Sequence, residues 1–452
     1  MINLANLYRG IQAAYQSKRM SARDAIEGLV RDASFVTFGS YAATPVALTR
    51  AYADAARNGV FNKSIITYLF RSSAEVASYF NDVSVLNSIK LILPFIGGEF
   101  GSIIKTARAN SGKIQYPEFT PGHFSHFEEN ILTQYGRPDV HMFQVSPMDR
   151  QGYFSFGIDG SFSIPMARVA DKIIVEVNRN FPRTFGDGII HINDVDAVVE
   201  HDSDLLVLTS KPAEEVDYKI ASYLEKFVGD GACIQLGIGG VPDAVGHSLL
   251  KKNDLGIHTE LLSGALVELM VNGNVTNKYK QLHRYHSVLN LAMLPSAEYY
   301  SYLNDNPSVL CYPASYVNNP QIIAQIDNMI SINSFLEIDL FGQVASESLH
   351  WHQLTGTGGQ VDFVRGAAAS KGGRSVLAAH STTKGNTISK IVPRLDNIVT
   401  TARTDVQYVA TEYGCFDLAG MSNRNRATTL IELAHPDFRD ELTAAARAMN
   451  LI

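Results

Sequence analysis

The chain is 452 residues long, 46% hydrophobic and 18% charged, with a formal net charge of −7. This length exceeds what one hydrophobic core usually sustains, so it favours two domains of roughly 200 residues each. The composition is typical of a globular protein, and the negative charge argues against a nucleic acid or an anionic membrane as a partner, because both need a dense basic surface.

The cysteines give no sign of a disulfide framework or a metal site. Cys233, Cys311 and Cys415 are far apart, with no CxxC pair and no histidine at metal spacing. The start of the sequence lacks the pattern of a signal peptide. The longest apolar stretch, residues 89–96, is far shorter than the ~20 residues of a membrane helix. We therefore expect a cytoplasmic protein without a metal and without membrane contact.

The first half of the chain alternates between predicted strands and helices. Residues 2–32 carry apolar side chains at helical spacing, and residues 34–38 form a strand pattern followed by a turn and a helix to about residue 58. Further strands are expected at residues 65–70, 89–95, 140–145 and 172–177. This alternation predicts an α/β fold with a mostly parallel sheet covered on both faces.

A domain boundary is expected near residue 211. Residues 194–204 are acidic and polar, and residues 210–213 form a turn-rich junction. The sequence therefore predicts an N-terminal domain over residues 1–211 and a C-terminal domain over residues 212–452.

The second half restarts the same alternation. A helix over residues 215–227 is followed by a strand over 232–236, a glycine turn, a helix that Pro242 opens, and a strand over 255–262. The remaining expected strands are at residues 288–293, 309–311, 329–333, 360–364, 375–379 and 398–401, and a helix near 438–449 closes the chain.

Residues 229–269 hold the strongest candidate site in the second half. Glu260 is a lone charge near the end of an apolar strand, where parallel sheets face their ligands. Burying a carboxylate there costs free energy unless it is paired or used. A helix cap or a surface ion pair is the structural alternative. Residues 237–240 form a glycine turn whose N–H groups could stabilise charge, although most such turns are structural.

Several common catalytic motifs are absent from the sequence. The third glycine of a dinucleotide fingerprint would fall at Pro242, and no P-loop lysine follows the turn. The histidines form no HExxH pattern, and no GxSxG elbow is present. A second glycine cluster, residues 355–363, could supply N–H donors or be a plain connecting turn.

Ordered motifs along almost the whole chain resemble those of a known family. In the first half they are Gln144-Val145-Ser146-Pro147, Asp149, Gly152-Tyr153, Val177-Asn178, Pro182-Arg183-Thr184, Gly186-Asp187 and His191-Ile192. In the second half they are residues 235–245, His258-Thr259-Glu260, residues 358–366, Ile391-Val392-Pro393, Thr411-Glu412-Tyr413-Gly414 and residues 434–439. The chain resembles the acetyl-CoA hydrolase/transferase family, a branch of the class I CoA-transferases that includes 4-hydroxybutyrate, butyrate–acetate and itaconate CoA-transferases.

This resemblance implies a fold and a reaction. It implies two CoA-transferase-type α/β domains with the active site at their interface. It also implies ping-pong transfer of CoA between a short-chain acyl-CoA and a small carboxylate, with Glu260 as the nucleophile that carries a glutamyl-CoA thioester. By the same resemblance, the backbone amides of Asn319 and of Gly358 or Gly359 bind the acyl oxygen.

CoA is implied as a co-substrate, with no permanently bound cofactor. The resemblance places the CoA contacts at Gln235, Gly237, Ile238, Gly239, Gly240, Val241 and Gln360. An acyl-CoA hydrolase and a catalytically silent CoA-binding protein are the alternatives. Size alone favours a homo-oligomer.

The chain departs from the family pattern at three places. Ser263-Gly264-Ala265 stands where the family commonly has Ser-Asp-Gly, Gln151 replaces a common histidine, and His350-Trp351-His352 is unusually bulky. These departures bear on the choice of substrate.

Overall fold

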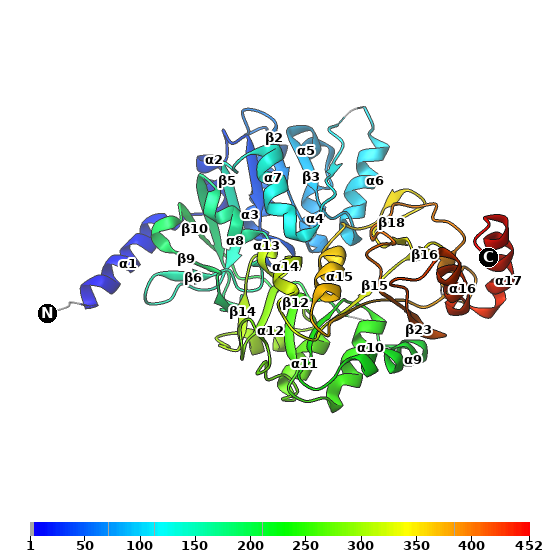
Figure 1. Ribbon diagram of the computed structural model, residues 1–452. Helices are drawn as coiled ribbons and strands as arrows, with labels where there is room; N and C mark the ends of the chain where they lie inside the picture. Colours follow the sequence, from blue (N-terminus) through cyan, green and yellow to red (C-terminus); the bar gives the residue numbers. More distant parts are fainter. Residues whose placement is uncertain (1–3, 71, 113, 210, 384) are drawn as a thin grey trace. The chain divides into compact units, whose positions relative to one another are not determined.

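The computed structural model describes residues 4–70, 72–112, 114–209, 211–383 and 385–452 (Figure 1). Within those ranges the chain forms two compact units. Unit 1 is drawn from Met1–Gly122, His126–Leu208 and Leu289–Ser315, and unit 2 from His123–Ser125, Thr209–Val288 and Tyr316–Ile452. Neither unit is therefore one continuous segment of the sequence.

Unit 1 is built on a parallel sheet. Its strand order is β10-β7-β5-β1-β2-β3-β4, and every neighbouring pair is parallel. The strands are β1 (Phe35–Phe38), β2 (Ile65–Tyr68), β3 (Ile89–Leu93), β4 (Glu118–Phe119), β5 (Val140–Val145), β7 (Lys172–Val177) and β10 (Ala197–Glu200). The predicted parallel sheet of the first half is confirmed.

Both faces of this sheet are buried, which explains the continuous apolar runs of its strands. Along β5, Val140 and Met142 belong to one apolar core, whereas Phe143 and Val145 belong to another. This alternation is the two-residue period of a strand. The helices of unit 1 are α1 (Leu4–Lys18), α2 (Ala22–Leu29), α3 (Val46–Arg57), α4 (Ala74–Phe80), α5 (Val83–Ser88), α6 (Gly101–Ala109), α7 (Phe127–Tyr135), α8 (Ser163–Val169) and α12 (Ala297–Leu303).

Short strands complete unit 1. β6 (Tyr153–Ser155) pairs in antiparallel fashion with β9 (Ile189–His191), and β8 (Phe185–Gly186) pairs in parallel with β14 (Val309–Cys311). β13 (Ser287–Ala292) and α13 (Ala314–Val317) each contain residues of both units.

Unit 2 also contains a mostly parallel sheet. Its strand order is β23-β22-β20-β15-β11-β12, and only the β22–β23 pair is antiparallel. The strands are β11 (Cys233–Leu236), β12 (Gly256–Leu262), β15 (Met329–Ser334), β20 (Arg374–Ala378), β22 (Tyr408–Thr411) and β23 (Gly414–Asp417). The sheet of the second half therefore also follows the predicted alternation.

The helices of unit 2 include one segment that sequence analysis assigned wrongly. They are α9 (Glu215–Leu224), α10 (Gly240–Ser248), α11 (Gly264–Val271), α14 (Pro320–Ile323), α15 (Gln360–Ala369), α16 (Asn423–Leu433) and α17 (Pro436–Ala448). The strand predicted at residues 360–364 is the first half of α15. A short apolar run fits either structure by its pattern alone, and here Gly359 caps a helix. The strand predicted at residues 398–401 is also wrong, because only Thr401 forms an isolated bridge there.

Smaller sheets lie beside this core in unit 2. They comprise β16 (Glu337–Asp339), β17 (Val344–Ala345) and β21 (Ile391–Val392), and the hairpin of β18 (Ser348–Leu349) and β19 (His352–Gln353). His350 and Trp351 form the turn of that hairpin, both with positive φ. No helix in the described part of the chain is long and apolar enough to cross a membrane.

Candidate active site

Glu260 lies near the carboxyl end of β12, level with the glycine turn. Ile234 on β11 is opposite Ile257 on β12, and continuing this register brings Gly237 level with Glu260. Leu236 is opposite Ile332 on β15, which brings Asn333 to the same level. Glu260 thus lies at the sheet edge where ligands bind in parallel α/β folds.

Two donors from distant parts of unit 2 hold the Glu260 carboxylate. The Asn318 side-chain amide donates to Oε2 at 2.6 Å. The Gly359 backbone N–H donates to the same carboxylate. A Cβ on residue 359 would overlap both Glu260 Oε2 and Asn318 Nδ2. Any larger residue at position 359 would therefore displace the Glu260 carboxylate and the Asn318 amide.

Burial is the largest influence on Glu260 and raises its pKa to about 7. The Asn318 amide lowers this pKa, the nearby Asp362 carboxylate raises it, and the Gly359 N–H lowers it. The side chain nevertheless keeps partial solvent exposure. Glu260 is therefore a partly exposed residue with a raised pKa at the carboxyl end of a parallel strand, which suits a nucleophile.

His258, two residues before Glu260, links β12 to the Asn318 loop. Its Nε2–H donates to the Val317 carbonyl at 2.8 Å, and Val317 directly precedes Asn318. His258 is fully buried, and desolvation lowers its pKa to about 3. The ring is therefore neutral, and it helps to set where the Asn318 amide lies.

A polar network behind the sheet edge connects β11 to β15. Gln235 accepts hydrogen bonds from Ser331 Oγ at 2.6 Å and from Asn333 Nδ2 at 3.2 Å, and its own amide donates to Asn333 Oδ1 at 3.1 Å. Gln235 and Ser331 are opposite each other in the sheet. Gln235 thus braces the strand ends on which the glycine turn begins.

The glycine turn over residues 237–240 leads from β11 into α10. Gly239 has φ of 115°, a conformation that favours glycine, and no atom lies within 4 Å of the position of its missing Cβ. At Gly240 a Cβ would overlap the Asp217 carboxylate of α9. Gly240 therefore allows close helix packing, while Gly239 leaves open space beside the turn.

Comparisons with known proteins cover both halves of the chain. Residues 4–208 match the acetyl-CoA hydrolase/transferase N-terminal domain, and residues 296–446 match the C-terminal domain of the same family. The chain belongs to the acetyl-CoA hydrolase/transferase family. It is an enzyme of the CoA-transferase type, as the resemblance implied.

Similar proteins extend this assignment. The succinyl-CoA:cyclohexane-1-carboxylate CoA transferase of Geobacter metallireducens is 46% identical over 75% of this chain and 77% of its own length. The 4-hydroxybutyrate coenzyme A transferase of Clostridium kluyveri is 44% identical over 74% of this chain and 77% of its own. The crystal structure of RipA from Yersinia pestis is 42% identical, with a TM-score of 0.93 over 98% of this chain and all of that one.

Two of the expected site residues of this CoA-transferase have their polar groups engaged elsewhere. The Asn319 N–H donates to the Tyr316 carbonyl at 3.2 Å, and the Asn319 side chain caps α14. The Gln360 side chain bonds to Ser346, Thr401 and the Ser334 carbonyl. Gln360 therefore fixes the start of α15, which carries Gly359.

The sequence did not point to Asn318 or to Asp362, which both act on Glu260. Asn318 is adjacent to the expected Asn319. The sequence therefore indicated a pair of asparagines, but it could not show which of the two side chains faces Glu260 on β12. Asp362 lies within a segment read as a strand, and its place in the first turn of α15 could not be seen from that reading.

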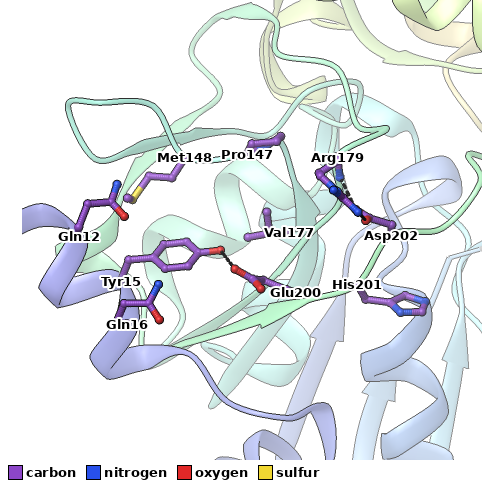
Figure 2. Close-up of a pocket in the computed structure, with 10 residues that line it drawn as sticks. All are labelled: Gln12, Tyr15, Gln16, Pro147, Met148, Val177, Arg179, Glu200, His201 and Asp202. Atoms are coloured by element: carbon purple, nitrogen blue, oxygen red, sulfur yellow. Dashed lines mark hydrogen bonds and ion pairs between the residues drawn. The ribbon is translucent and has the colours of Figure 1, made fainter.

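A separate pocket lies within unit 1 of the enzyme. Its volume is about 650 Å³, and it is found where β5, β7 and β10 end. Figure 2 shows two interacting pairs in its lining: the Tyr15 hydroxyl donates to Glu200, and Arg179 forms an ion pair with Asp202. None of the expected site residues lines it. The pocket is therefore not part of the candidate site that contains Glu260.

The described residues contain no cluster of three or more histidine, cysteine, aspartate or glutamate side chains that could hold a metal ion. Cys233 and Cys311 are buried thiols, and Cys415 is partly buried.

Proposed function

We propose that this enzyme transfers CoA between a short-chain acyl-CoA and a free carboxylate, with Glu260 as the nucleophile. One observation carries the proposal: a carboxylate with a pKa near 7 stands at an accessible strand end, held by two neutral donors. None of its partners among the described residues is a lysine or arginine. Its charge is therefore not neutralised by an ion pair, which keeps it reactive.

The reaction would proceed in two balanced halves. A Glu260 oxygen attacks the thioester carbonyl of the acyl-CoA, the C–S bond breaks, and CoA leaves as a thiolate. The acyl group is then joined to Glu260 in a mixed anhydride. The thiolate then attacks the glutamyl carbonyl, which gives a glutamyl-CoA thioester and releases the first carboxylate. The acceptor carboxylate repeats these steps in reverse and leaves as its acyl-CoA. No net proton or electron is exchanged.

Asn318 and Gly359 would stabilise the charge that develops on Glu260. Both donors aim at the carboxylate, so in the acylated enzyme they would lie beside the glutamyl carbonyl oxygen. That oxygen becomes an oxyanion when the thiolate attacks, and preorganised donors stabilise such charge best. We assign the oxyanion contact to Asn318 instead of the neighbouring Asn319, because the Asn319 N–H already donates to Tyr316.

The glycine turn would receive the thiol end of CoA. Ile238 is 43% exposed and Gly239 has open space beside it, whereas Val241 is buried. Gly237 lies level with Glu260 by the strand register. A thiol bound along residues 237–240 would therefore approach the glutamyl carbonyl. In this proposal Gln235 and Gln360 act by holding the turn and α15 in place.

For the acceptor we propose a small carboxylate of the 4-hydroxybutyrate, butyrate or itaconate type. The name of one relative supports this class, since it refers to 4-hydroxybutyrate, whereas the name of another refers to the larger cyclohexane-1-carboxylate. We also propose a cytoplasmic location, because the three thiols of the sequence are free and CoA transfer needs a pool of CoA esters. Measuring CoA transfer to each of a series of carboxylic acids tests the proposed acceptor class directly.

The experiment combines trapping with exchange. The protein is incubated with acetyl-CoA, butyryl-CoA or succinyl-CoA, treated with borohydride or hydroxylamine, digested, and mapped by mass. We expect modification at Glu260 alone, and transfer of CoA to added carboxylate that exceeds release of free CoA. Free CoA without transfer would instead indicate a hydrolase. The absence of any Glu260 adduct would contradict the proposed mechanism.

A further inference from the structure

A three-residue segment from the first half of the sequence packs within unit 2, against the turn that holds Glu260. The Phe124 N–H donates to the Gly358 carbonyl at 3.2 Å. Ser125 donates twice to Asp362, from its N–H at 3.1 Å and from its Oγ at 2.7 Å. Phe124 and Ser125 are both buried. We call His123–Ser125 the latch segment.

The contacts of the latch segment fall on both sides of Gly359. Gly358 precedes Gly359 and has φ of 66°, in the left-handed region, with open space where its Cβ would be. Asp362 follows in the first turn of α15 and is 2% exposed. A glycine pair is conformationally free by itself, so its position has to be fixed by neighbouring groups. The latch segment supplies such groups.

Asp362 also places a negative charge near the nucleophile. Its Oδ1 accepts from the Ser125 hydroxyl and its Oδ2 from the Ser125 N–H. Ser125 thus engages both oxygens of this buried carboxylate. The negative charge of Asp362 raises the pKa of Glu260. The hydrogen bonds of Ser125 therefore act on Glu260 through Asp362.

We propose that Ser125 and Asp362 are positioning residues for the transfer reaction, which pin the Gly358-Gly359 turn against Glu260 and tune the charge of the nucleophile. The inference rests on the proposed role of Glu260. Ser125 would then contribute to the positioning of the Glu260 site although 237 residues of sequence separate it from Asp362. Neither side chain needs to touch the substrate.

Among the titratable groups around Glu260, Asp362 is the one whose charge acts on the pKa of Glu260. His258 on the same strand is neutral, because burial lowers its pKa to about 3. Lys280 donates to the Ile257 carbonyl of β12 at 2.7 Å and to the His286 carbonyl at 2.7 Å. Lys280 is not among the groups that shift the pKa of Glu260, whereas Asp362 is.

The test compares two variants with matched controls in unit 2. Asp362→Asn is paired with Asp339→Asn, because Asp339 is another buried acid that accepts backbone N–H groups, from Phe341 and Gln343. Ser125→Ala is paired with Ser370→Ala, because Ser370 is a buried serine whose hydroxyl donates to the Ile326 carbonyl. Neither control residue bonds to Glu260 or to the glycine turn. The rate of CoA transfer and its KM are measured from pH 5 to 9.

For Asp362→Asn we expect the acid limb of the pH profile to move to lower pH by about half a unit or more, because a like charge beside Glu260 is lost. We also expect kcat to fall by roughly tenfold or more, because the turn loses an anchor. For Ser125→Ala we expect a fall in kcat of about threefold to thirtyfold, with KM for acyl-CoA changed less than about twofold. Ser125→Thr, which keeps the hydroxyl, should restore most of the rate.

Thermal unfolding of each variant separates a fold defect from a positioning defect. A Ser125→Ala protein as stable as Ser370→Ala but slower in transfer supports the proposal. The proposal would be overturned if, in both Ser125→Ala and Asp362→Asn, the acid limb of the pH–rate profile did not move and the transfer rate equalled that of the control variant. If instead the wild type carries no adduct at Glu260, the proposed function itself fails. If the adduct forms at the same rate in wild type and variants, only the latch inference fails.

Discussion

The two units each carry a glutamate with a raised pKa on a strand of their parallel sheet, and the two residues have different surroundings. Glu176 on β7 in unit 1 is fully buried, and its carboxylate accepts from the backbone N–H groups of Val46, Ala47 and Leu48 at the start of α3. Glu260 on β12 in unit 2 is partly exposed and is held by Asn318 and Gly359. Burial raises the pKa of Glu176 to about 8 and that of Glu260 to about 7.

A raised pKa is therefore not sufficient to identify a nucleophile. Glu176 has the higher pKa of the two, but its hydrogen-bond donors are the N–H groups at the start of α3, and its side chain is not exposed to solvent. Glu260 combines the raised pKa with an open strand end and a glycine turn at the same level. In the proposed function, accessibility and the geometry of the donors distinguish the reactive carboxylate from the structural one.

Removing each carboxylate in turn tests most strongly whether Glu260 and Glu176 differ in their contribution to transfer. Glu260→Gln should lower the rate of CoA transfer by about 10⁴-fold or more, because an amide cannot form the anhydride. Glu176→Gln should keep the rate within about threefold, because the amide oxygen can still accept from α3. Exchange of labelled carboxylate into acyl-CoA measures both. Equal losses in the two variants would show that the comparison is wrong.

The next largest effect is expected at Gly359. Gly359→Ala places a methyl group where Glu260 Oε2 and Asn318 Nδ2 meet, so the carboxylate has to move. We expect the transfer rate to fall by about 10²-fold to 10³-fold, as for the loss of an oxyanion donor.

Gly59→Ala is a control for a general loss of stability on replacing a glycine; Gly359 itself has φ of −102°, so its replacement acts through steric overlap and not through backbone strain. Gly59 in unit 1 has φ of 66° and open space at its Cβ position. We expect this control to lose roughly 1 kcal/mol of stability from backbone strain and to keep its transfer rate. A fully active Gly359→Ala enzyme would refute the placement of Glu260 beside this turn.

A smaller effect should separate the two adjacent asparagines. Asn318→Ala removes a donor that favours the ionised carboxylate, so the pKa of Glu260 should rise above 7 and the acid limb of the rate profile should move to higher pH. We expect kcat/KM at pH 7 to fall by about tenfold to a hundredfold. Asn319→Ala removes only a cap of the short α14 and should cost less. A larger loss in Asn319→Ala would reverse the assignment.

The smallest effect concerns stability as a function of pH. An acid whose pKa is raised in the native state binds more protons there than in the unfolded chain, so it makes stability fall as pH rises through this window. The window runs from about 4.5 to about 7 for Glu260 and to about 8 for Glu176. Each Glu→Gln variant should flatten part of this fall. Thermal unfolding at pH 5, 6.5 and 8 checks this, and parallel curves for wild type and variants would contradict it.

The sequence could predict the local features of the site. The apolar strand that carries Glu260 and the glycine turn after β11 are patterns within a few residues, and both lie where they were expected. The alternation of strands and helices likewise predicted the parallel sheets. These features depend on short-range chemistry, which a single sequence displays directly.

The partners of Glu260 could not be predicted in the same way. Asn318 lies 58 residues away in sequence, and its selection over Asn319 depends on how His258 fixes the Val317 carbonyl. Asp362 was hidden because residues 360–364 fit a strand as well as a helix. Contacts of this kind are set by tertiary packing, which local patterns do not contain.

The most direct test of the central claim follows oxygen atoms. In the proposed reaction an acceptor carboxylate labelled with ¹⁸O on both oxygens forms the anhydride with Glu260, and one labelled oxygen stays on the enzyme when CoA takes the acyl group. After turnover, the digested protein should carry ¹⁸O in the peptide that contains Glu260 and none in the peptide that contains Glu176. Transfer of CoA without label in the Glu260 peptide would contradict the account.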